Sequence, residues 1–438
     1  MSFLESSRIL RADNGSEVAV ADLVGTGERP PVWSLNERGH MVARAVSGLT
    51  GGGRREAFIV RLASGREMEA SADTSLMTLG GWVPISNLHV GDRVAIPRRV
   101  PAPSDVRPMA DDELVLLAHM IGDGSCVKSQ PIRYASIDEI NLSAVTKAAL
   151  HFGVTAKRDD YAAARVTTLR LPAPYHLTHG RRNPVAAWLD GFGIFGKRSY
   201  EKFVPAPVFA APNQQIALFL MHLWSTDGCI TWDAKQRLGN VYYASTSRRL
   251  VDDVRQLLLR LGIPTRLYRV AQGRYRDAWH LRVFGAGNQR RFLTVVDAHG
   301  LKFFAAREVL SNLQGIASNE NVDTVPSEVW DTVRQRLRDQ GMSHRAFADS
   351  MGIKFCGNAM WKPSPSRSRL HRAAAILDDR GLHDLTTNDV LWDRVVEITG
   401  IGEQDVYRVE VDGADNVVAN GISVRASHDV NTGDAITR

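Results

Sequence analysis

The sequence predicts a multidomain protein in which an all-β domain is split by an α+β insertion made of two repeats, with a small helical domain in addition. Strand patterns occupy both ends of the chain, the segments 113–126 and 216–229 resemble each other, and a later stretch has only helical periodicity. The two parts of the β domain are predicted at residues 2–100 and 393–426. The two repeats occupy 108–315, the helical domain occupies 322–390, and a short tail occupies 427–438.

The composition is that of a soluble globular protein of several domains, with 438 residues, 44% hydrophobic and 23% charged. No apolar run reaches the roughly 18–20 residues of a membrane span, and no basic region followed by an apolar core opens the chain. We therefore expect a cytoplasmic protein with no membrane partner. The three cysteines, Cys126, Cys229 and Cys356, are too scattered for a disulfide framework or a zinc site.

The net charge of +6 is unevenly distributed, because arginines gather in short clusters. Such clusters favour a polyanionic partner, although solvated helix faces would give the same pattern. If the partner is DNA, the candidate contacts are Lys197, Arg248, Arg249, Arg290, Arg291, Arg367 and Arg369.

The β domain is predicted from short alternating segments. Residues 56–85 read "EAFIVRLASGREMEASADTSLMTLGGWVPI", with Ser64-Gly65 and Gly80-Gly81 as turns. Near the other end, "DVYRVEV" at 405–411 is followed by the turn "DGADN" and by "VVANGISV". Connections inside compact domains are mostly short, so strand patterns this far apart indicate a large insertion into one domain.

The insertion contains an internal repeat. "ELVLLAHMIGDGSC" at 113–126 matches "IALFLMHLWSTDGC" at 216–229, and Asp123 and Asp227 are 227 − 123 = 104 residues apart. Downstream, Tyr134 aligns with Tyr243 and Gly153 with Gly262, both with an offset of 109. Each unit is predicted to be a helix, a hairpin carrying Tyr-Ala-Ser, a second helix and a strand. The expected helices are 112–121, 141–151, 213–224 and 248–261.

The paired Asp-Gly sequences predict a metal site. If the two motif helices pack side by side, their C-terminal ends converge, and Asp123 and Asp227 lie near each other. Close carboxylates repel unless a hard cation lies between them, and Mg²⁺ fits oxygen ligands with few protein contacts. Paired metals stabilise the attacking and leaving oxygens of a phosphodiester. The alternative is that both Asp-Gly pairs are helix ends with exposed aspartates.

Residues 116–124 "LLAHMIGDG" and 220–228 "LMHLWSTDG" resemble the paired motifs of LAGLIDADG homing endonucleases. The resemblance implies metal binding by Asp123 and Asp227 with their neighbours Gly122 and Thr226, and it places the closing motif glycines at Gly124 and Gly228. In the family, small residues let the motif helices pack closely. His222 and Thr226 are bulkier here.

The segment "GFGIFGKRSYEKFVPAPVF" at 191–209 resembles the lysine-bearing segment of intein-encoded members of this family. The resemblance assigns Lys202 a position near the scissile phosphate, with Lys197 as a second candidate. An exposed lysine without a role is the alternative, more so for Lys197.

The two ends of the chain resemble an intein splicing domain of the Hint type. "SFLESSRILRADNGS" at 2–16 resembles the opening strand, which places the splicing nucleophile at Ser2, and "NVVANGISV" belongs to the closing motifs. The resemblance makes Ser427 the first host residue. It implies a terminal asparagine at Ala426, and alanine has no amide with which to cyclise, so splicing is expected to be blocked.

Other splicing positions also depart from the family. Its Thr-x-x-His motif is replaced by "SADT" at 71–74, in which Ser71, Asp73 and Thr74 are the candidate helpers. The remaining two histidine positions are occupied by Asp415 and Arg425. Natural degeneration, engineering and a different catalytic arrangement are all compatible with these replacements. The chain resembles mycobacterial helicase and recombinase inteins.

Residues 324–385 resemble a helix-turn-helix DNA-binding domain. "MSHRAFADSMGI" has the serine N-cap, the small alanine and the glycine of a helix-turn-helix. The basic segment "SRSRLHR" could contact the phosphates of the DNA backbone. The alternative is a helical spacer.

The leading hypothesis is a monomeric intein with an embedded homing endonuclease that cuts double-stranded DNA of the intein-less host allele with Mg²⁺, joined in cis to host exteins. A non-catalytic LAGLIDADG and helix-turn-helix regulator, and a splicing element with a decayed endonuclease, are the competing hypotheses.

Overall fold

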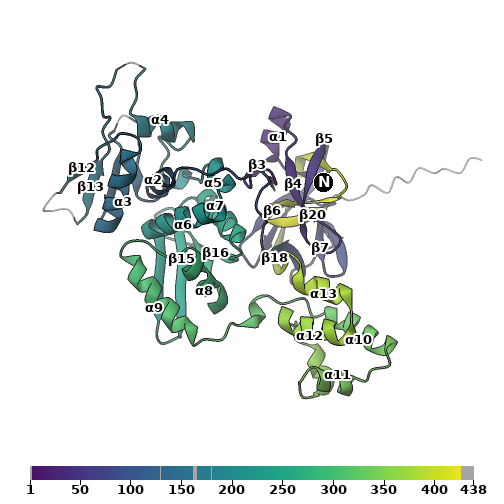
Figure 1. Ribbon diagram of the computed structural model, residues 1–438. Helices are drawn as coiled ribbons and strands as arrows, with labels where there is room; N and C mark the ends of the chain where they lie inside the picture. Colours follow the sequence, from purple (N-terminus) through teal and green to yellow (C-terminus); the bar gives the residue numbers. More distant parts are fainter. Residues whose placement is uncertain (1, 129, 161–164, 179, 426–438) are drawn as a thin grey trace, which may run out of the picture. The chain divides into compact units, whose positions relative to one another are not determined.

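The computed structural model describes residues 2–128, 130–160, 165–178 and 180–425. They form two compact units, described separately below (Figure 1). Unit 1 contains the residues before Asn14, residues Glu17–Arg98 and the chain from Glu320 onward; unit 2 contains Asn14–Ser16 and Arg99–Asn319. Within the described ranges, no helix is long and apolar enough to cross a bilayer.

Unit 1 is built on two six-stranded sheets, with strand orders β4-β5-β6-β1-β18-β9 and β3-β2-β19-β20-β7-β8. Each sheet combines strands from both ends of the chain. Their bounds are β1 Ser2–Phe3, β2 Arg8–Leu10, β3 Glu17–Ala19, β4 Pro31–Leu35, β5 Met41–Leu62, β6 Glu67–Ser71, β7 Ser75–Thr78, β8 Gly81–Pro84, β9 Arg93–Pro97, β18 Val390–Val411, β19 Asn416–Ala419 and β20 Ile422–Arg425. A helix, α1 Val20–Thr26, and a 3-10 turn, η1 Ile85–Asn87, accompany them.

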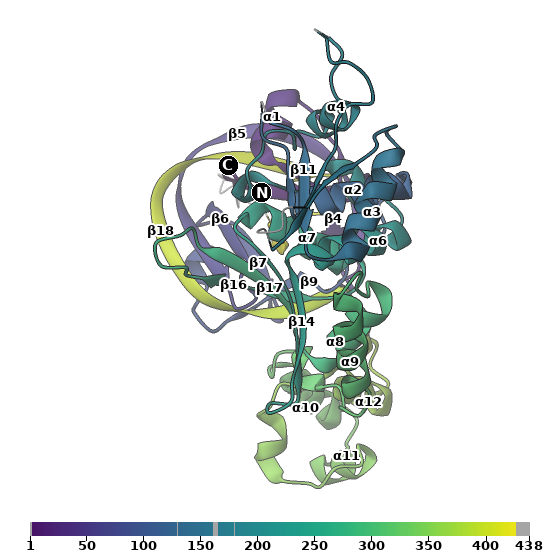
Figure 2. The same ribbon diagram turned by 90° about the vertical axis from the view of Figure 1, so that its left-hand side faces the viewer.

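Two 22-residue strands, β5 and β18, join the ends of the chain. They pair antiparallel from Val395↔Leu62 to Val411↔Val46, with four register shifts, and Figure 2 shows them as two long curved ribbons at the rim of unit 1. The shifts increase local twist and let such long strands bend around one core. Phe3, Val60 and Val424 are fully buried in that core.

The helical segment of unit 1 contains α10 Val329–Asp339, α11 His344–Ser350, α12 Arg367–Leu377 and α13 Arg380–Thr387, with the turns η3 Glu320–Val322 and η4 Gly357–Trp361. As expected, Ser343 caps α11 by accepting from the Ala346 N–H at 3.1 Å. The Trp361 ring packs against Trp330 and Phe347, with centroid distances of 5.4 and 5.8 Å. A 3-10 turn follows α11, where a recognition helix would be expected to begin.

Unit 2 has two similar halves. Each has a four-stranded sheet, in the orders β10-β11-β13-β12 and β14-β15-β17-β16. The strands are β10 Gly124–Ser125, β11 Arg133–Ser136, β12 Lys157–Asp159, β13 Thr167–Arg170, β14 Gly228–Asp233, β15 Leu238–Ser245, β16 Thr265–Val270 and β17 Ala278–Val283. The helices are α2 Asp111–Ile121, α3 Glu139–Leu150, α4 Pro184–Gly191, α5 Ala206–Ala210, α6 Asn213–Asp227, α7 Arg248–Arg260, α8 Ala286–Val295 and α9 Lys302–Gln314, with the turn η2 Ser199–Glu201.

The repeat predicted from the sequence is confirmed in backbone register. Gly124 pairs with Tyr134 in the first half, and Gly228 pairs with Tyr243 in the second. The helices that follow are also capped at matched places: the Asp138 carboxylate accepts from backbone N–H groups of α3, and the Ser247 hydroxyl oxygen accepts from the Leu250 N–H of α7. Local hydrogen bonding thus starts both helices at the same point of the repeat.

Candidate functional site

The two motif helices pack against each other and end at the aspartates. Asp123 follows α2 by two residues, and Asp227 is the last residue of α6. Both side chains reach solvent, yet the surrounding protein partly dehydrates them. This dehydration, together with the negative charge of Asp227, raises the pKa of Asp123 to about 6. Dehydration also raises the pKa of Asp227. The ends of the two motif helices that carry these aspartates converge in unit 2, as predicted.

Glycines permit the close packing of the motif helices. A Cβ atom on Gly122 would overlap the Thr226 side chain of the other helix. A Cβ atom on Gly124 would overlap Met120, and one on Gly228 would overlap Trp224, each four residues earlier in the chain. Thr226 is therefore accommodated because the residue opposite it has no side chain.

The Gly228→Ala substitution is expected to lower the free energy of unfolding by about 3 kcal/mol, since extra methyl groups in a tight site force side chains and backbone to move. Gly191→Ala in α4 is the matched control, because its Cβ atom would meet nothing within 4 Å. Urea unfolding of both variants measures the difference. An equal effect of the two substitutions would mean that Trp224 and the last turn of α6 can move aside without cost.

His222, which is bulkier than the family pattern, is accommodated by a buried hydrogen-bond network. Nε2 of His119 lies 3.0 Å from Nδ1 of His222. Nδ1 of His119 lies 3.0 Å from the Tyr134 hydroxyl oxygen. The His299 ring packs on His222, with a centroid distance of 4.2 Å. His119 is fully buried, and burial is the main reason that its pKa lies well below the usual value. For the same reason the pKa of His222 falls to about 3.

These neutral histidines predict acid sensitivity. The unfolded chain binds protons at His119 and His222 below about pH 6.5 and the folded chain does not, so stability falls as the pH falls. Each histidine is expected to lower the free energy of unfolding by about 2 kcal/mol as the pH falls from 7.5 to 5. Over that pH range, the free energy of unfolding of the double variant His119→Leu/His222→Leu should fall by about 4 kcal/mol less than that of the parent. Asp123 titrates in both proteins and cancels in the comparison, which chemical unfolding at several pH values can make.

Two lysines lie at the ends of the motif helices. The Lys202 ammonium donates to the carbonyl oxygens of Met120, Gly122 and Gly124 at 3.0, 3.2 and 2.8 Å. The second, Lys302, donates to the carbonyl oxygens of Trp224 and Thr226.

Lys302 is a site residue that sequence reasoning missed. A signal was present, because "EKFVPA" at 201–206 resembles "LKFFAA" at 301–306 and continues the repeat. The positive charge of each lysine opposes the rise of the Asp123 and Asp227 pKa values.

The donor set fits a hard divalent cation. It consists of two carboxylates, with the carbonyl oxygens of Gly122 and Thr226 nearby, and Mg²⁺ and Ca²⁺ prefer oxygen ligands. In the described part of the chain, no group of three or more histidine, cysteine and acidic side chains could hold a metal ion. An ion here would therefore keep several waters, which is usual for Mg²⁺.

The solvent-facing sides of both sheets carry aligned cations. In the first half Arg170 lies between Arg133 and Lys157 across three strands. In the second half Arg282 pairs with Arg266 and Tyr242. Sequence reasoning missed these residues, although the period-two alternation of the strands would have shown that they share one face.

Two of the predicted DNA contacts, Arg290 and Arg367, are hydrogen-bonded within the fold. Arg290 donates to the carbonyl oxygens of Leu313 and Ile316, at the end of α9. The Arg367 side chain is only 10% exposed and is paired with Asp323, and it also donates to backbone carbonyls. Both guanidinium groups donate to carbonyls inside the fold, which leaves fewer of their donors for phosphates.

The other predicted contacts differ in their surroundings. Lys197 is exposed. Arg248 forms an ion pair with Asp252, and its guanidinium lies 4.6 Å from the centroid of the Trp279 ring. Arg249 pairs with Asp253, Arg291 donates to the Leu261 carbonyl, and Arg369 stacks on Trp330.

In unit 1, the predicted splicing residues at the N-terminal side come together. Ser2 is 8% exposed in β1, and its carbonyl oxygen accepts from the Thr74 hydroxyl at 3.0 Å. Ser71 lies 3.1 Å from Thr74, oxygen to oxygen, and 3.5 Å from the Ser2 carbonyl oxygen. Asp73 is partly exposed between them. These hydroxyl groups hold the backbone of Ser2 in place.

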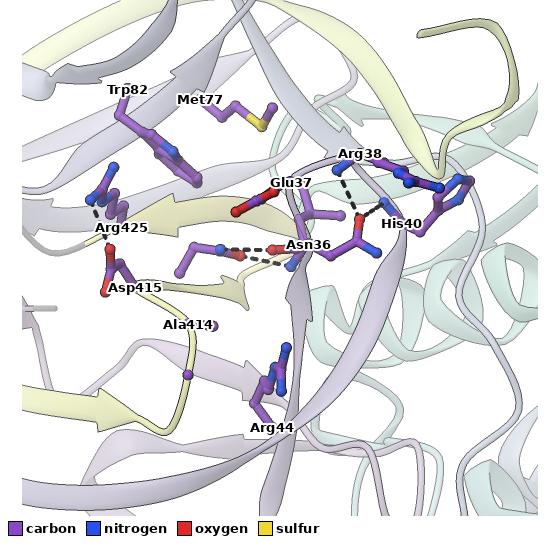
Figure 3. Close-up of a pocket in the computed structure, with 13 residues that line it drawn as sticks. Asn36, Glu37, Arg38, His40, Arg44, Met77, Trp82, Ala414, Asp415 and Arg425 are labelled. Carbon is purple, nitrogen blue, oxygen red and sulfur yellow. Dashed lines mark hydrogen bonds and ion pairs between the residues drawn. The ribbon is translucent and has the colours of Figure 1, made fainter. Parts of the chain in front are cut away.

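The C-terminal splicing residue Arg425 lies on β20, which pairs with β7. Arg425 pairs in register with Ser75, the neighbour of Thr74. Asp415 and Arg425, which replace two histidines, form an ion pair at 2.8 Å, drawn as a dashed line in Figure 3. They line a pocket of about 610 Å³ with Trp82 and Arg44. Ala426 and Ser427 lie outside the described residues.

Comparison with known proteins supports the same picture. Residues 214–297 match the model of the LAGLIDADG-like domain. The chain is 34% identical over 434 residues to the replicative DNA helicase DnaB of Synechocystis sp. (strain ATCC 27184 / PCC 6803 / Kazusa), covering 96% of this chain and 49% of that protein. It is 36% identical over 425 residues to the Rhodothermus marinus DnaB helicase, covering 96% and 45%, respectively.

A third relative is protein RecA of Mycobacterium tuberculosis (strain ATCC 25618 / H37Rv), 26% identical over 471 residues and covering 99% of this chain and 58% of RecA. The chain spans about half the length of the curated relatives it matches. Nearly all of it thus aligns with part of proteins that carry different names, as expected of an inserted element.

Among solved structures, the Ssp DnaB mini-intein variant M86 matches 22% of this chain and 64% of its own, with 26% identity and a TM-score of 0.21. The I-DmoI complex with DNA and Mn matches 43% of this chain and 96% of its own, with 13% identity and a TM-score of 0.30.

The fold and the site define a β domain formed by both ends of the chain and a two-repeat domain with paired carboxylates. The chain is intein-like, and residues 214–297 match a LAGLIDADG-like domain.

Proposed function

We propose that unit 2 is a site-specific endonuclease that cleaves double-stranded DNA with Mg²⁺. One observation carries the proposal: two packed motif helices from matched repeats end at carboxylates, and Gly122 beside Asp123 lies against Thr226 beside Asp227. A divalent cation at this position would lower the energy of the charged oxygens of a phosphodiester under attack. Asp123 and Asp227 would hold the ion, and the Lys202 and Lys302 ammonium groups supply positive charge beside it.

DNA binding is proposed for the solvent-facing sides of the two sheets. A two-stranded β-ribbon fits the major groove, and arginine pairs with guanine or phosphate there. The cations of the two halves occupy matched positions, since 266 − 157 = 109 and 282 − 170 = 112. Affinity should fall steeply with salt, because each neutralised phosphate releases counterions. We further propose that the protein acts as a monomer in the cytoplasm, and that the helical segment 322–390 adds contacts to DNA.

Incubation with intein-less DNA of the host gene and Mg²⁺ tests the proposal. Discrete double-strand breaks are expected with Mg²⁺ and none with EDTA. A mobility shift without breaks would instead support the non-catalytic regulator or the decayed endonuclease. A host-gene fragment that already contains the insertion is the matched control, since the target would be interrupted there.

For unit 1 we propose an intein splicing domain, joined in cis to host exteins, whose last step is blocked. The Ser2 hydroxyl would attack the preceding carbonyl, while Ser71 and Thr74 hold its backbone. Residues 427–438 would be host sequence. The terminal position is Ala426, which has no side-chain amide to close a ring on its own carbonyl, so the C-terminal bond would stay intact.

A further inference from the structure

The carbonyl oxygens of the residues just before Asp123 and Asp227 already accept hydrogen bonds from ammonium groups. Lys202, which is 4% exposed, bonds the Gly122 carbonyl, one residue before Asp123. Lys302 bonds the Thr226 carbonyl, one residue before Asp227. Each lysine also bonds the carbonyl two residues earlier, Met120 in the first half and Trp224 in the second. The arrangement therefore occurs twice, at matched points of the repeat.

We propose that Lys202 and Lys302 are internal cations that hold the motif-helix ends in the metal-free protein and leave the Gly122 and Thr226 carbonyls when a divalent cation binds. The inference rests on the proposed function, because it concerns the same metal site. It assigns the lysines a role before DNA arrives, as competitors of the ion.

Electrostatics require some positive charge at this place. The C-terminal end of a helix carries a partial negative charge, and here two such ends meet two carboxylates. Without a cation, these charges repel one another across one interface. An ammonium group with three donors satisfies the exposed carbonyls of the last turn and offsets the charge.

The same positive charge opposes a divalent ion. Two ammonium groups close to both carboxylates repel an arriving cation. The Gly122 and Thr226 carbonyl oxygens are also poorer ligands for the cation while they accept hydrogen bonds from the lysines. The bound ion replaces the neutralising effect of the lysines, so they are free to move toward a DNA phosphate. Metal binding and lysine position are thus coupled.

Calcium binding to the full chain tests the coupling, since the readout is affinity and not cleavage. Calorimetric titration of Lys202→Met and Lys302→Met is expected to show Ca²⁺ bound on the order of tenfold more tightly than by the parent, because removing a nearby like charge lowers the repulsion. Lys235→Met removes an exposed lysine from the turn between β14 and β15 and should leave the affinity unchanged. Equal or weaker binding by both active-site variants would overturn the inference.

A measurement on the parent protein covers the case in which the variants fail to fold. With ¹⁵N-labelled lysine, hydrogen-bonded ammonium groups give sharp nitrogen–proton signals, while mobile ones exchange their protons rapidly with water. Two sharp signals are expected in EDTA, assigned through conservative Lys→Arg variants, and both should broaden on adding Ca²⁺. Signals that stay sharp at saturating Ca²⁺ would overturn the inference and leave the nuclease proposal intact. If Ca²⁺ does not bind to the parent or to either variant, the metal site itself fails, and both proposals fail with it.

Discussion

Replacing Asp123 or Asp227 with asparagine should abolish DNA cleavage, with a rate loss on the order of 10³-fold or more. Metal-assisted charge stabilisation supplies several kcal/mol to such reactions, and each 1.36 kcal/mol corresponds to a tenfold change in rate. Asparagine keeps the shape of the side chain but removes the charge that holds the ion. Single-turnover cleavage of a supercoiled plasmid bearing the target measures both strands separately.

Two further readouts separate loss of chemistry from loss of fold. Each variant should still shift the target duplex in Ca²⁺, since the cations on the two sheet faces are untouched. Each should also be more stable than the parent in EDTA, because one of two repelling carboxylates is gone. Asp190→Asn, which removes an exposed carboxylate of α4 paired with Arg182, is the matched control and should cleave normally. Full cleavage by the Asp123→Asn and Asp227→Asn variants would end the proposed role of the pair.

The repeat could be predicted from the sequence because its landmarks are local. The Asp-Gly ends and the tyrosines Tyr134 and Tyr243 keep register along the chain, and helical periodicity places them on known elements. Lys302 was not predicted, because the segments around Lys202 and Lys302 are separated by 100 residues, whereas the other landmarks of the repeat are separated by 104 or 109. A repeat with insertions loses register, while its geometry persists.

The histidine network could not be predicted, because it depends on which faces of α2 and α6 meet. His119 lies one turn before Asp123 and reads as an ordinary apolar-face residue in the sequence. Its partners His222 and Tyr134 come from a different helix and a strand. Only the packed pair of helices brings these polar groups into one buried chain of hydrogen bonds.

The contacts of the clustered arginines could not be predicted either, for a different physical reason. A guanidinium group has five donors, and carbonyls at helix ends lack partners. Arg290 and Arg367 meet that need within the fold. The sequence shows where positive charge is dense, whereas the strand register shows which cations, such as Arg266 and Arg282, share an open face.

Restoring the terminal asparagine, Ala426→Asn, in a chain with host sequence on both sides should release the C-terminal flank, where the parent releases none. The parent should give no released product and the variant a detectable one, because alanine has no side-chain nitrogen to attack the backbone carbonyl. Mass spectrometry of the purified protein detects the freed flank and a cyclised terminal residue. Ala426→Gln is the matched control, since its longer amide would close a larger, less favourable ring.

The release is expected to be slow, because Asp415 and Arg425 occupy positions where the family has histidines. Their ion pair holds the strand end but supplies no imidazole, and general acid–base catalysis contributes about 10²–10⁴-fold. Adding Asp415→His and Arg425→His to Ala426→Asn should therefore speed release toward that range. If release is equally fast without the histidines, the Asp415–Arg425 pair is itself a competent substitute for them. If no flank is released even with all three changes, unit 1 has the fold of a splicing domain but has lost the geometry of its last step.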